Sequence, residues 1–422
     1  MLPVSSAPIR DGAVAIEDGR IAAVGTQDEL GRGAHYGQSA IVPGLVNAHS
    51  HLEYAVFAGF GDGLGDFSEW IGLHVERKSR LDPAHFVDIA RVGAAECLGS
   101  GVTTIGDCSY SGAAAQACAD LGLGAIVYIE VFGSDPTAAL TRFGTNRERF
   151  SGSFSENVRP GVSPHTPFTA SADVFRACSE LGLPTATHLS ESRSETAYLL
   201  DGSGPWEHYR HLLVDPPGTT GTRLLAGLGL LGPDVVAAHC VEVDAEEIAL
   251  LAERGAAVAH CPRSNALLGC GIAPVRALLD AGVTVGLGTD SPASTPSFDM
   301  FEELRAAVSL ARAREHRPDA LGAHEALGLA TLGSAKALGL DAEIGSLELG
   351  KRADLTIVSL EGSPFLPWED PAAAVVLGGS PDRVTATLVG GEVRYERGGF
   401  DWRELRQKGR RARARLLGLP DV

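Results

Sequence analysis

The amino-acid sequence predicts an α/β fold, a (β/α)8 TIM barrel with a small β-sandwich domain built from both chain ends. Three observations lead to this prediction. Short apolar runs alternate with helix-like stretches through the middle of the chain, and polar residues follow the runs at the same end. Both chain ends, in contrast, show the short-period alternation of β-strands around glycine turns.

Eight apolar runs are candidate barrel strands, at residues 40–48, 102–108, 124–131, 158–163, 184–188, 234–239, 256–260 and 283–289. Helix-like segments separate them, among them 83–98, 170–181 and 245–254. Strands that alternate with helices form parallel sheets, and eight of them fit a closed barrel. An open doubly wound sheet is the competing interpretation, and the lack of a G-x-G-x-x-G motif after the first strand weighs against it.

The chain ends predict a second, smaller unit. Residues 13–25 alternate around the turn Glu17-Asp18-Gly19, and residues 353–397 do so around a hairpin at Gly390-Gly391. The tail from residue 401 is rich in arginine and predicts a solvated amphipathic helix. The expected domains are therefore 1–42 and 346–400 for the small β-sandwich, 43–345 for the barrel, and 401–422 for the basic tail.

The composition of the chain argues against some classes of binding partner. The 422 residues are 44% hydrophobic and 21% charged, which is typical of a globular protein. The formal charge of −18 argues against nucleic acid and anionic membranes as partners. We see no run of 18 apolar residues and no signal peptide, and the seven scattered cysteines indicate a reducing cytoplasm. A small-molecule substrate is expected, and a homodimer is the base-rate expectation for the assembly.

Four polar groups predict a metal site at the carboxyl ends of the strands. His49 and His51 close the first strand, and residues i and i+2 of a strand share a face. His188 and Asp290 follow two later strands, so the four can supply the three or four ligands of a catalytic divalent metal. Many two-metal sites use a carboxylated lysine, and no lysine lies between Lys78 and Lys336. A single metal is therefore expected.

Three groups are candidates for proton transfer. Glu191 stands three residues after His188, where a carboxylate can act as general acid and base. Asp290 can bind the metal and also accept the proton of the attacking water. His239 follows another strand and can hydrogen-bond that water or the developing oxyanion.

Six motifs resemble those of the amidohydrolase superfamily, in its chlorohydrolase and adenosine-type deaminase branch. They lie at residues 43–53 (PGLVNAHSHLE), 163–165 (SPH), 188–191 (HLSE), 239–240 (HC), 288–291 (GTDS) and 345–355 (GSLELGKRADL). The resemblance covers nearly the whole chain.

The resemblance implies a distorted barrel, one bound Zn2+ or Fe2+, and hydrolytic removal of an amino group from a heterocycle. It implies that His49, His51, His188 and Asp290 bind the metal and that Glu191 and His239 serve catalysis. His165 would face the substrate ring. The family also has another strand before the point where Met1 stands, so a first strand of the small domain is expected to be missing or truncated.

Residues 163–169 and 260–271 further resemble bacterial enzymes that act on 6-aminodeoxyfutalosine, an adenine nucleoside of an alternative menaquinone pathway. The expected reaction is attack of hydroxide, formed at the metal, on C6 of the purine with release of ammonia. The substrate's benzoate would need an arginine, and Arg77, Arg80, Arg193 and Arg263 are candidates. Trp70 is expected either to stack on a ring of the substrate or to pack the long loop after the first strand, and Ser291 of the GTDS motif is expected to contact the substrate.

Other functions stay open at this point. S-adenosylhomocysteine, methylthioadenosine and adenosine are alternative substrates of the same class. A guanine-type or other heterocycle deaminase, a formimino hydrolase and an s-triazine chlorohydrolase are alternative enzymes, although Glu191 favours deamination because departing ammonia must be protonated. A non-catalytic scaffold would have lost a ligand, and none is lost.

Overall fold

The largest sheet is a nearly closed barrel of eight parallel strands. The computed structural model describes residues 1–31, 33–362 and 369–420. The sheet has the order β11-β10-β9-β8-β7-β6-β5-β4, and a parallel bridge between Ser50 and Asp290 joins its two edges. The strands are β4 (Leu45–Ser50), β5 (Val102–Ser109), β6 (Gly124–Val131), β7 (Val158–Pro164), β8 (Thr185–Leu189), β9 (Val235–His239), β10 (Ala257–His260) and β11 (Val285–Leu287). The predicted barrel is confirmed.

The first predicted strand was wrong in one respect, because residues 40–48 form parts of two strands. β3 (Ser39–Pro43) pairs antiparallel with β12 (Leu355–Ser359) outside the barrel, and only β4 enters the barrel. The chain changes sheets at Gly44, whose amide donates to Asp354 O at 2.8 Å. A Cβ at this position would overlap the side chain of Thr103, so only glycine permits the crossing.

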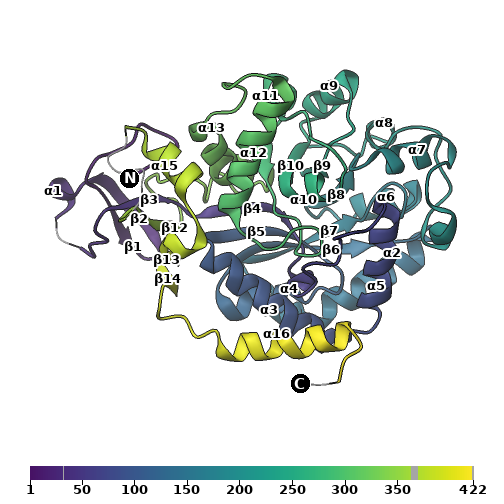
Figure 1. Cartoon of the computed structure of the whole chain (residues 1–422), viewed down its shortest axis with the longest axis horizontal. Coiled ribbons are helices and arrows are strands. Elements are labelled where there is room, and N and C mark those ends of the chain that lie inside the picture. Colours follow the sequence, from purple (N-terminus) through teal and green to yellow (C-terminus); the bar gives the residue numbers. More distant parts are fainter. Residues whose placement is uncertain (32, 363–368, 421–422) are drawn as a thin grey trace.

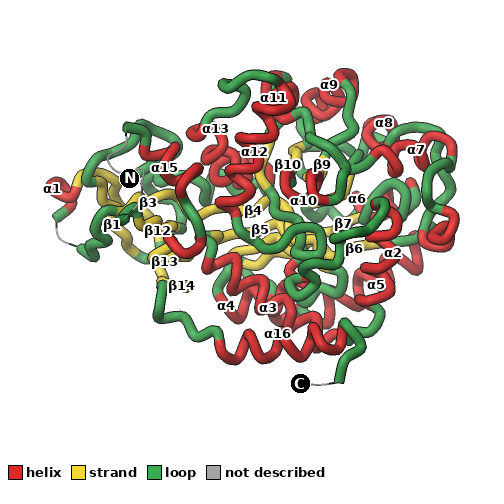
Figure 2. The backbone as a smooth tube through the Cα atoms, in the orientation of Figure 1, coloured by secondary structure: helices red, strands yellow, loops and turns green. Residues whose placement is uncertain are grey.

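Helices cover the outside of the barrel (Figures 1 and 2). The α-helices outside the small sheets are α2 (Phe67–Lys78), α3 (Pro83–Gly99), α4 (Ala114–Leu121), α5 (Pro136–Arg149), α6 (Ala172–Ser179), α7 (Arg193–Asp201), α8 (Gly221–Gly227), α9 (Ala245–Arg254), α10 (Pro262–Leu267), α11 (Val275–Asp280), α12 (Met300–Glu315), α13 (Ala323–Gly328), α14 (Ser334–Ala337), α15 (Pro371–Gly378) and α16 (Arg403–Leu416). Shorter turns are η1 (Leu52–Tyr54), η2 (Ser151–Ser153), η3 (Glu207–Leu212), η4 (Leu329–Gly333, a π-helical turn) and η5 (Pro381–Arg383). In the described ranges, no helix is both long and apolar enough to cross a membrane.

Local sequence explains where the long helices begin. Asp82 accepts hydrogen bonds from the first turn of α3, and Pro83 occupies its first position. Asp244 and Glu247 form a capping box at α9, which spans the residues predicted for it. These caps fix the helices that return the chain from one strand to the next.

The chain ends form two small antiparallel sheets beside the barrel (Figure 1). One has the order β14-β13-β12-β3, with β13 (Val384–Val389) and β14 (Glu392–Glu396); the other is the hairpin of β1 (Gly12–Glu17) and β2 (Arg20–Thr26), which α1 (Gln27–Leu30) follows. Ile21, Leu355 and Ile357 belong to one apolar cluster that both sheets share. On this basis we propose that 1–42 and 346–400 are two parts of one domain, with 43–345 as the barrel and 401–422 as the tail.

The basic tail forms the predicted helix, but one of its faces is not solvated. α16 runs along α3 below the barrel (Figure 1). Gly409, Ala412 and Leu416 are buried in that contact. Arg413 donates to the carbonyl oxygens of Val56 and Ala58 at 2.6 and 3.1 Å. The helix therefore fastens the chain's end to the segment that follows β4.

Candidate active site and metal centre

A cavity of about 250 Å³ opens at the carboxyl ends of the barrel strands. Its floor holds His51, His188, His239 and Asp290, which lie at or just after the ends of β4, β8, β9 and β11. In barrels of this kind the strand ends hold functional side chains rigidly while the loops shape the entrance. The cavity is thus where chemistry is expected.

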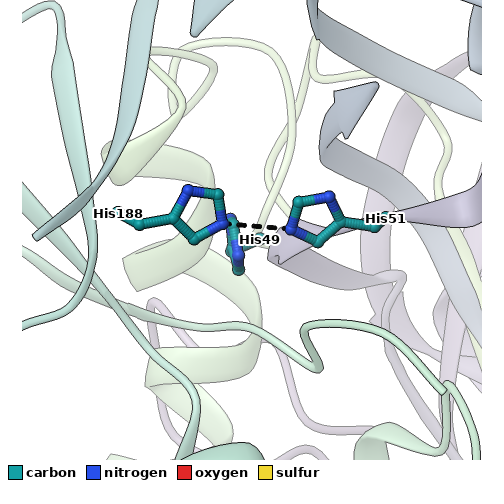
Figure 3. A group of neighbouring side chains, drawn as sticks. All are labelled: His49, His51 and His188. Atoms are coloured by element: carbon teal, nitrogen blue, oxygen red, sulfur yellow. Dashed lines mark hydrogen bonds between the residues drawn. The ribbon is translucent and has the colours of Figure 1, made fainter. Parts of the chain in front are cut away.

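Three histidines point toward one another at this end of the barrel, as Figure 3 shows. The ring centroids of His49, His51 and His188 lie 4.9 to 5.2 Å apart. One nitrogen from each lies within 4.8 Å of the others, and Nε2 of His51 is 3.1 Å from Nε2 of His188. His49 fits against the barrel wall because position 288 is glycine, where a Cβ would come within 2.8 Å of the His49 Cβ.

The protonation of these imidazoles suits a metal. Burial lowers the pKa of His51 and of His188 to about 3, and burial together with the neighbouring imidazoles lowers the pKa of His49 well below its usual value. All three are therefore neutral near pH 7, which is the ligand form. His188 Nδ1 lies 3.0 Å from the carbonyl oxygen of His165 and so carries the proton. The other ring nitrogen, Nε2, is therefore unprotonated, and its lone pair can bind a metal. His49 Nε2 is buried without a hydrogen-bond partner in the described structure.

Asp290 completes the set of predicted metal ligands. Its Oδ1 lies 3.9 Å from His49 Nε2 and 3.6 Å from His51 Nε2, while its Oδ2 accepts hydrogen bonds from Ser264 and Ser294 at 2.6 Å each. Three neutral imidazoles and one carboxylate are a donor set that suits Zn2+ and also Fe2+. The residues present therefore fit the metal that the sequence predicted.

Glu191 and His239 face one another beside this set. Glu191 Oε2 lies 3.8 Å from His239 Nε2. The Glu195 carboxylate accepts hydrogen bonds from the backbone amides of Ser190 and Glu191, at 2.9 and 2.7 Å. These bonds fix the loop that carries Glu191. Burial, with a smaller contribution from the Asp290 charge, raises the pKa of Glu191 well above its usual value. His239 Nδ1 lies 2.9 Å from Asn265 Oδ1, which directs Nε2 to the cavity.

Three predicted substrate contacts lie in the cavity wall. His165, Trp70 and Ser291 all line it. The Trp70 indole donates to Ala293 O at 3.0 Å, and its ring stacks against Phe67 and His74 of the same helix. Trp70 therefore connects α2 to the loop after β11.

The roof of the cavity comes from two loops. α2 follows β4, and η3 lies between β8 and β9. Tyr209 of η3 lies directly on Gly72 of α2, where the Cβ of any other residue would collide with the tyrosine ring. Ser68 also donates to Pro205 O at 2.7 Å. The two loops therefore contact one another over the cavity that the predicted metal ligands line.

Two predicted substrate contacts lie elsewhere. Arg263 does not line the cavity; its guanidinium binds Glu303 and Glu302 and donates to Ser297 O at 2.7 Å. The Arg193 side chain is 89% exposed and lies 3.4 Å from Glu242. Because neither side chain points at the cavity, we leave both out of the substrate site.

The other two arginine candidates are also engaged away from the cavity. Arg80 binds Glu76 at 2.7 Å and the carbonyl oxygen of Leu416 at 3.0 Å. The Arg77 guanidinium lies 3.8 Å from the centre of the Phe60 ring.

Three charged groups that were not predicted as site residues also line the cavity. Lys78, at the end of α2, and Arg142 of α5 line its outer part, and Glu130 lines the floor. Glu130 is the last residue but one of β6, so its place near the carboxyl end of a barrel strand follows from the apolar run 124–131. Nothing in the sequence placed the end of α2 or the middle of α5 next to this cavity.

Comparison with known proteins identifies the family. Residues 40–394 match the family model described as "Amidohydrolase family", and residues 12–32 match an "Imidazolonepropionase-like composite domain, bacteria". The chain belongs to the amidohydrolase family. It is therefore a hydrolase that acts on carbon–nitrogen bonds, and its cavity floor is a histidine-rich metal site.

Relatives cover nearly all of this amidohydrolase. It is 34% identical to the 5-methylthioadenosine/S-adenosylhomocysteine deaminase of Nitratidesulfovibrio vulgaris, over 96% of this chain and 92% of the relative. It is 32% identical to the 5'-deoxyadenosine deaminase of Methanothermobacter thermautotrophicus, over 91% and 89%. The crystal structure of an adenosine deaminase from Xanthomonas campestris with bound zinc superposes with a TM-score of 0.88, at 29% identity over 99% of this chain and 97% of that one.

Proposed function

We propose that this amidohydrolase deaminates an adenine-type nucleoside at C6, with Zn2+ as its metal and 6-aminodeoxyfutalosine as its particular substrate. The observation that carries the proposal is the set of six groups at one end of the barrel. Four can hold a metal, His49, His51, His188 and Asp290, and two lie beside it, with Glu191 3.8 Å from His239. Three relatives that work on adenine nucleosides by name support the choice of base.

The residues divide the chemistry between them. A divalent metal held by the four ligands would lower the pKa of a water molecule and make it nucleophilic near pH 7. Glu191, whose pKa is raised by burial, carries a proton to the ring nitrogen of the base, takes the two protons of the attacking water in turn and passes one of them to the amino group, which leaves as ammonia. His239 Nε2 donates to or accepts from the oxygen that is added at C6. Asp290, held by Ser264 and Ser294, orients the attacking water.

Two observations support 6-aminodeoxyfutalosine as the particular substrate. Residues 163–169 and 260–271 carry the resemblance to enzymes of 6-aminodeoxyfutalosine, and the cavity extends outward from the metal ligands between aromatic walls. This substrate would place the enzyme in menaquinone biosynthesis. All seven cysteines are free, which supports a reducing cytoplasm as its location. A homodimer stays a prediction.

The test is ammonia release by purified, metal-loaded enzyme from a panel of substrates: 6-aminodeoxyfutalosine, S-adenosylhomocysteine, methylthioadenosine, adenosine, guanine and 8-oxoguanine. We expect efficient turnover of 6-aminodeoxyfutalosine. Preference for another adenine nucleoside would replace the substrate and keep the reaction. Turnover of guanine alone, or of none of the six by an enzyme that holds one metal per chain, would overturn the adenine proposal and move the search to formimino and triazine compounds.

A further inference from the structure

A thiol lies against one ring nitrogen of His49. Cys108 Sγ is 3.7 Å from His49 Nδ1, and both residues are buried, with 1% of each exposed. They are the last residues but one of the neighbouring parallel strands β4 and β5, so the rigid sheet sets their contact. The other ring nitrogen, Nε2, is buried without a hydrogen-bond partner among the described residues and lies 3.9 Å from Asp290 Oδ1.

The nitrogen that binds the metal decides the direction of the bond between His49 and Cys108. A neutral imidazole carries one proton on its two nitrogens. If Nε2 of His49 is a ligand, the proton is on Nδ1, and Nδ1 then donates to the sulfur. A proton on Nε2 would instead block the ligand atom. An acceptor beside Nδ1 therefore keeps His49 in the form that binds a metal.

Two other imidazoles at this end of the barrel have an oxygen acceptor in the equivalent place. His188 Nδ1 lies 3.0 Å from the carbonyl oxygen of His165, and His239 Nδ1 lies 2.9 Å from Asn265 Oδ1. His49 has a sulfur there, and sulfur is a weaker acceptor than oxygen.

Apolar surroundings explain why a thiol takes this place. Cys108 belongs to one buried cluster with Ala48, Ile126 and Tyr128. An ionised carboxylate is costly to bury among such side chains. A thiol packs there as a small hydrophobic group and still presents lone pairs to the His49 ring.

We propose that Cys108 is a positioning residue for the metal: its sulfur accepts the Nδ1 proton of His49 and holds the ring with Nε2 toward the other ligands. The inference rests on the proposed function, because it takes His49 as a ligand. Loss of an outer partner of a histidine ligand lowers the affinity for a metal by about 10–100-fold, and a weak acceptor belongs at the lower end of that range.

Cys261 offers a matched control for the packing of Cys108. Its thiol is also fully buried near His49, since a Cβ at position 288 would lie 2.8 Å from the His49 Cβ and 3.0 Å from Cys261 Sγ. In the described structure, however, this thiol donates to Ala259 O at 3.6 Å and makes no hydrogen bond to the His49 ring. Its loss removes similar packing and leaves the partner of His49 in place.

The test measures the affinity of the purified full-length protein for Zn2+ by competition with a chromogenic chelator. Cys108→Ala should raise the Kd by roughly tenfold, and Cys261→Ala should leave it near the wild-type value. Cys108→Ser keeps an acceptor, so its Kd should lie between those of Cys108→Ala and the wild type. The visible absorption bands of the Co2+-loaded protein should change in Cys108→Ala and not in Cys261→Ala, because these bands report the ligands and not the stability of the fold.

Equal Kd values for Cys108→Ala and Cys261→Ala would overturn the role of Cys108, as would Co2+ bands that neither substitution changes. Cys108→Val, which fills the space of the thiol but has no acceptor, decides the question if Cys108→Ala does not fold. His49→Asn separates this inference from the proposed ligands. If His49→Asn binds Zn2+ as tightly as the wild type, His49 is not a ligand and the proposed metal site fails. If it loses affinity while Cys108→Ala and Cys108→Val do not, the ligands stand and the role of Cys108 is overturned.

Discussion

At the residue scale, the active-site end of the barrel holds unusual backbone. Ser190, His239, Cys240 and Asp290 have φ values of 51°, 73°, 46° and 55°, in the left-handed region that residues with a Cβ seldom adopt. Each follows or ends a buried strand. Such conformations cost free energy and persist where the surroundings over-determine them. Here the strained residues include two of the groups assigned to catalysis, His239 and Asp290, and the rigid sheet holds them.

Replacing Glu191 by Gln tests its role in proton transfer. The amide keeps the shape of the side chain but cannot exchange a proton, so turnover should fall by roughly 10²-fold or more. Metal content should not change, because Glu191 lies beside the ligands and is not one of them. Steady-state kinetics and metal analysis of the purified variant measure the two effects. Turnover near the wild-type value would remove Glu191 from the mechanism, and Glu253→Gln, at an exposed position, is the control.

Glu96 predicts a pH dependence of stability. Burial raises its pKa from 4.5 to about 7, although the amide of Phe298 and the charge of Arg263 oppose the rise. Between these two values the folded state binds more protons than the unfolded state, so this group's contribution to the free energy of unfolding falls as pH rises from about 4.5 to about 7.

Glu96→Gln should remove this contribution, since Gln can still accept from Phe298 N. The free energy of unfolding of the variant relative to the wild type should therefore increase from pH 5 to pH 8, by of the order of 2 kcal/mol. Urea titrations at several pH values measure it. A difference that does not change with pH would show that Glu96 keeps an ordinary pKa in the folded protein.

At the element scale, the strands could be predicted from sequence and the loops could not. Each barrel strand is an apolar run closed by polar residues, so its position and the residues at its end follow from local pattern. The exception is residues 40–48, which are apolar except for Asn47 and cover most of β3, which is largely buried, and most of β4, which is buried throughout. Lys78 and Arg142 lie on helices after β4 and β6, and their approach depends on how the loops fold over the barrel. The place of Arg263 depends on tertiary structure in the same way, because its acidic partner, Glu303, lies 40 residues away in sequence and holds it outside the cavity lining.

The hydrogen bonds of α16 predict that replacing Arg413 destabilises the protein. The amphipathic pattern of the tail sequence does not predict this effect. Arg413→Met removes hydrogen bonds to the carbonyl oxygens of Val56 and Ala58 and leaves both without that donor. The free energy of unfolding should fall by about 1–3 kcal/mol. Arg411→Met, two residues earlier on the exposed face, should change it by less than about 0.5 kcal/mol. Denaturant midpoints compare the variants, and equal values would mean that α16 contributes nothing through Arg413.

At the scale of the whole molecule, the proposed metal ligands come from distant parts of the barrel. His49 belongs to β4 and His51 follows it, His188 belongs to β8, and Asp290 lies in the turn after β11, so a bound metal would link the first, fifth and eighth strands of the sheet. A ligand that binds only the folded state stabilises it by mass action.

Removal of the metal by a chelator should therefore lower the melting temperature without unfolding the protein at room temperature. At a free metal concentration of 100 times Kd, the expected loss is about 2.7 kcal/mol. Calorimetry of the chelated and the reloaded protein measures it. In His188→Asn the chelator should have much less effect, and a melting temperature that the chelator leaves unchanged in the wild type would argue against a metal at these residues.

The contact of Tyr209 with Gly72 joins two roof elements to each other, so the roof can be changed separately from the strand ends below it. The proposed metal ligands lie at strand ends, whereas the roof belongs to α2 and η3, two elements between strands that exchange no hydrogen bond with those ligands in the described structure. Changes in these loops alter the shape and charge of the cavity and leave the hydrolytic chemistry in place. A library restricted to residues 64–78 and 203–214 should therefore yield enzymes of new selectivity at a far higher frequency than one spread over the barrel strands.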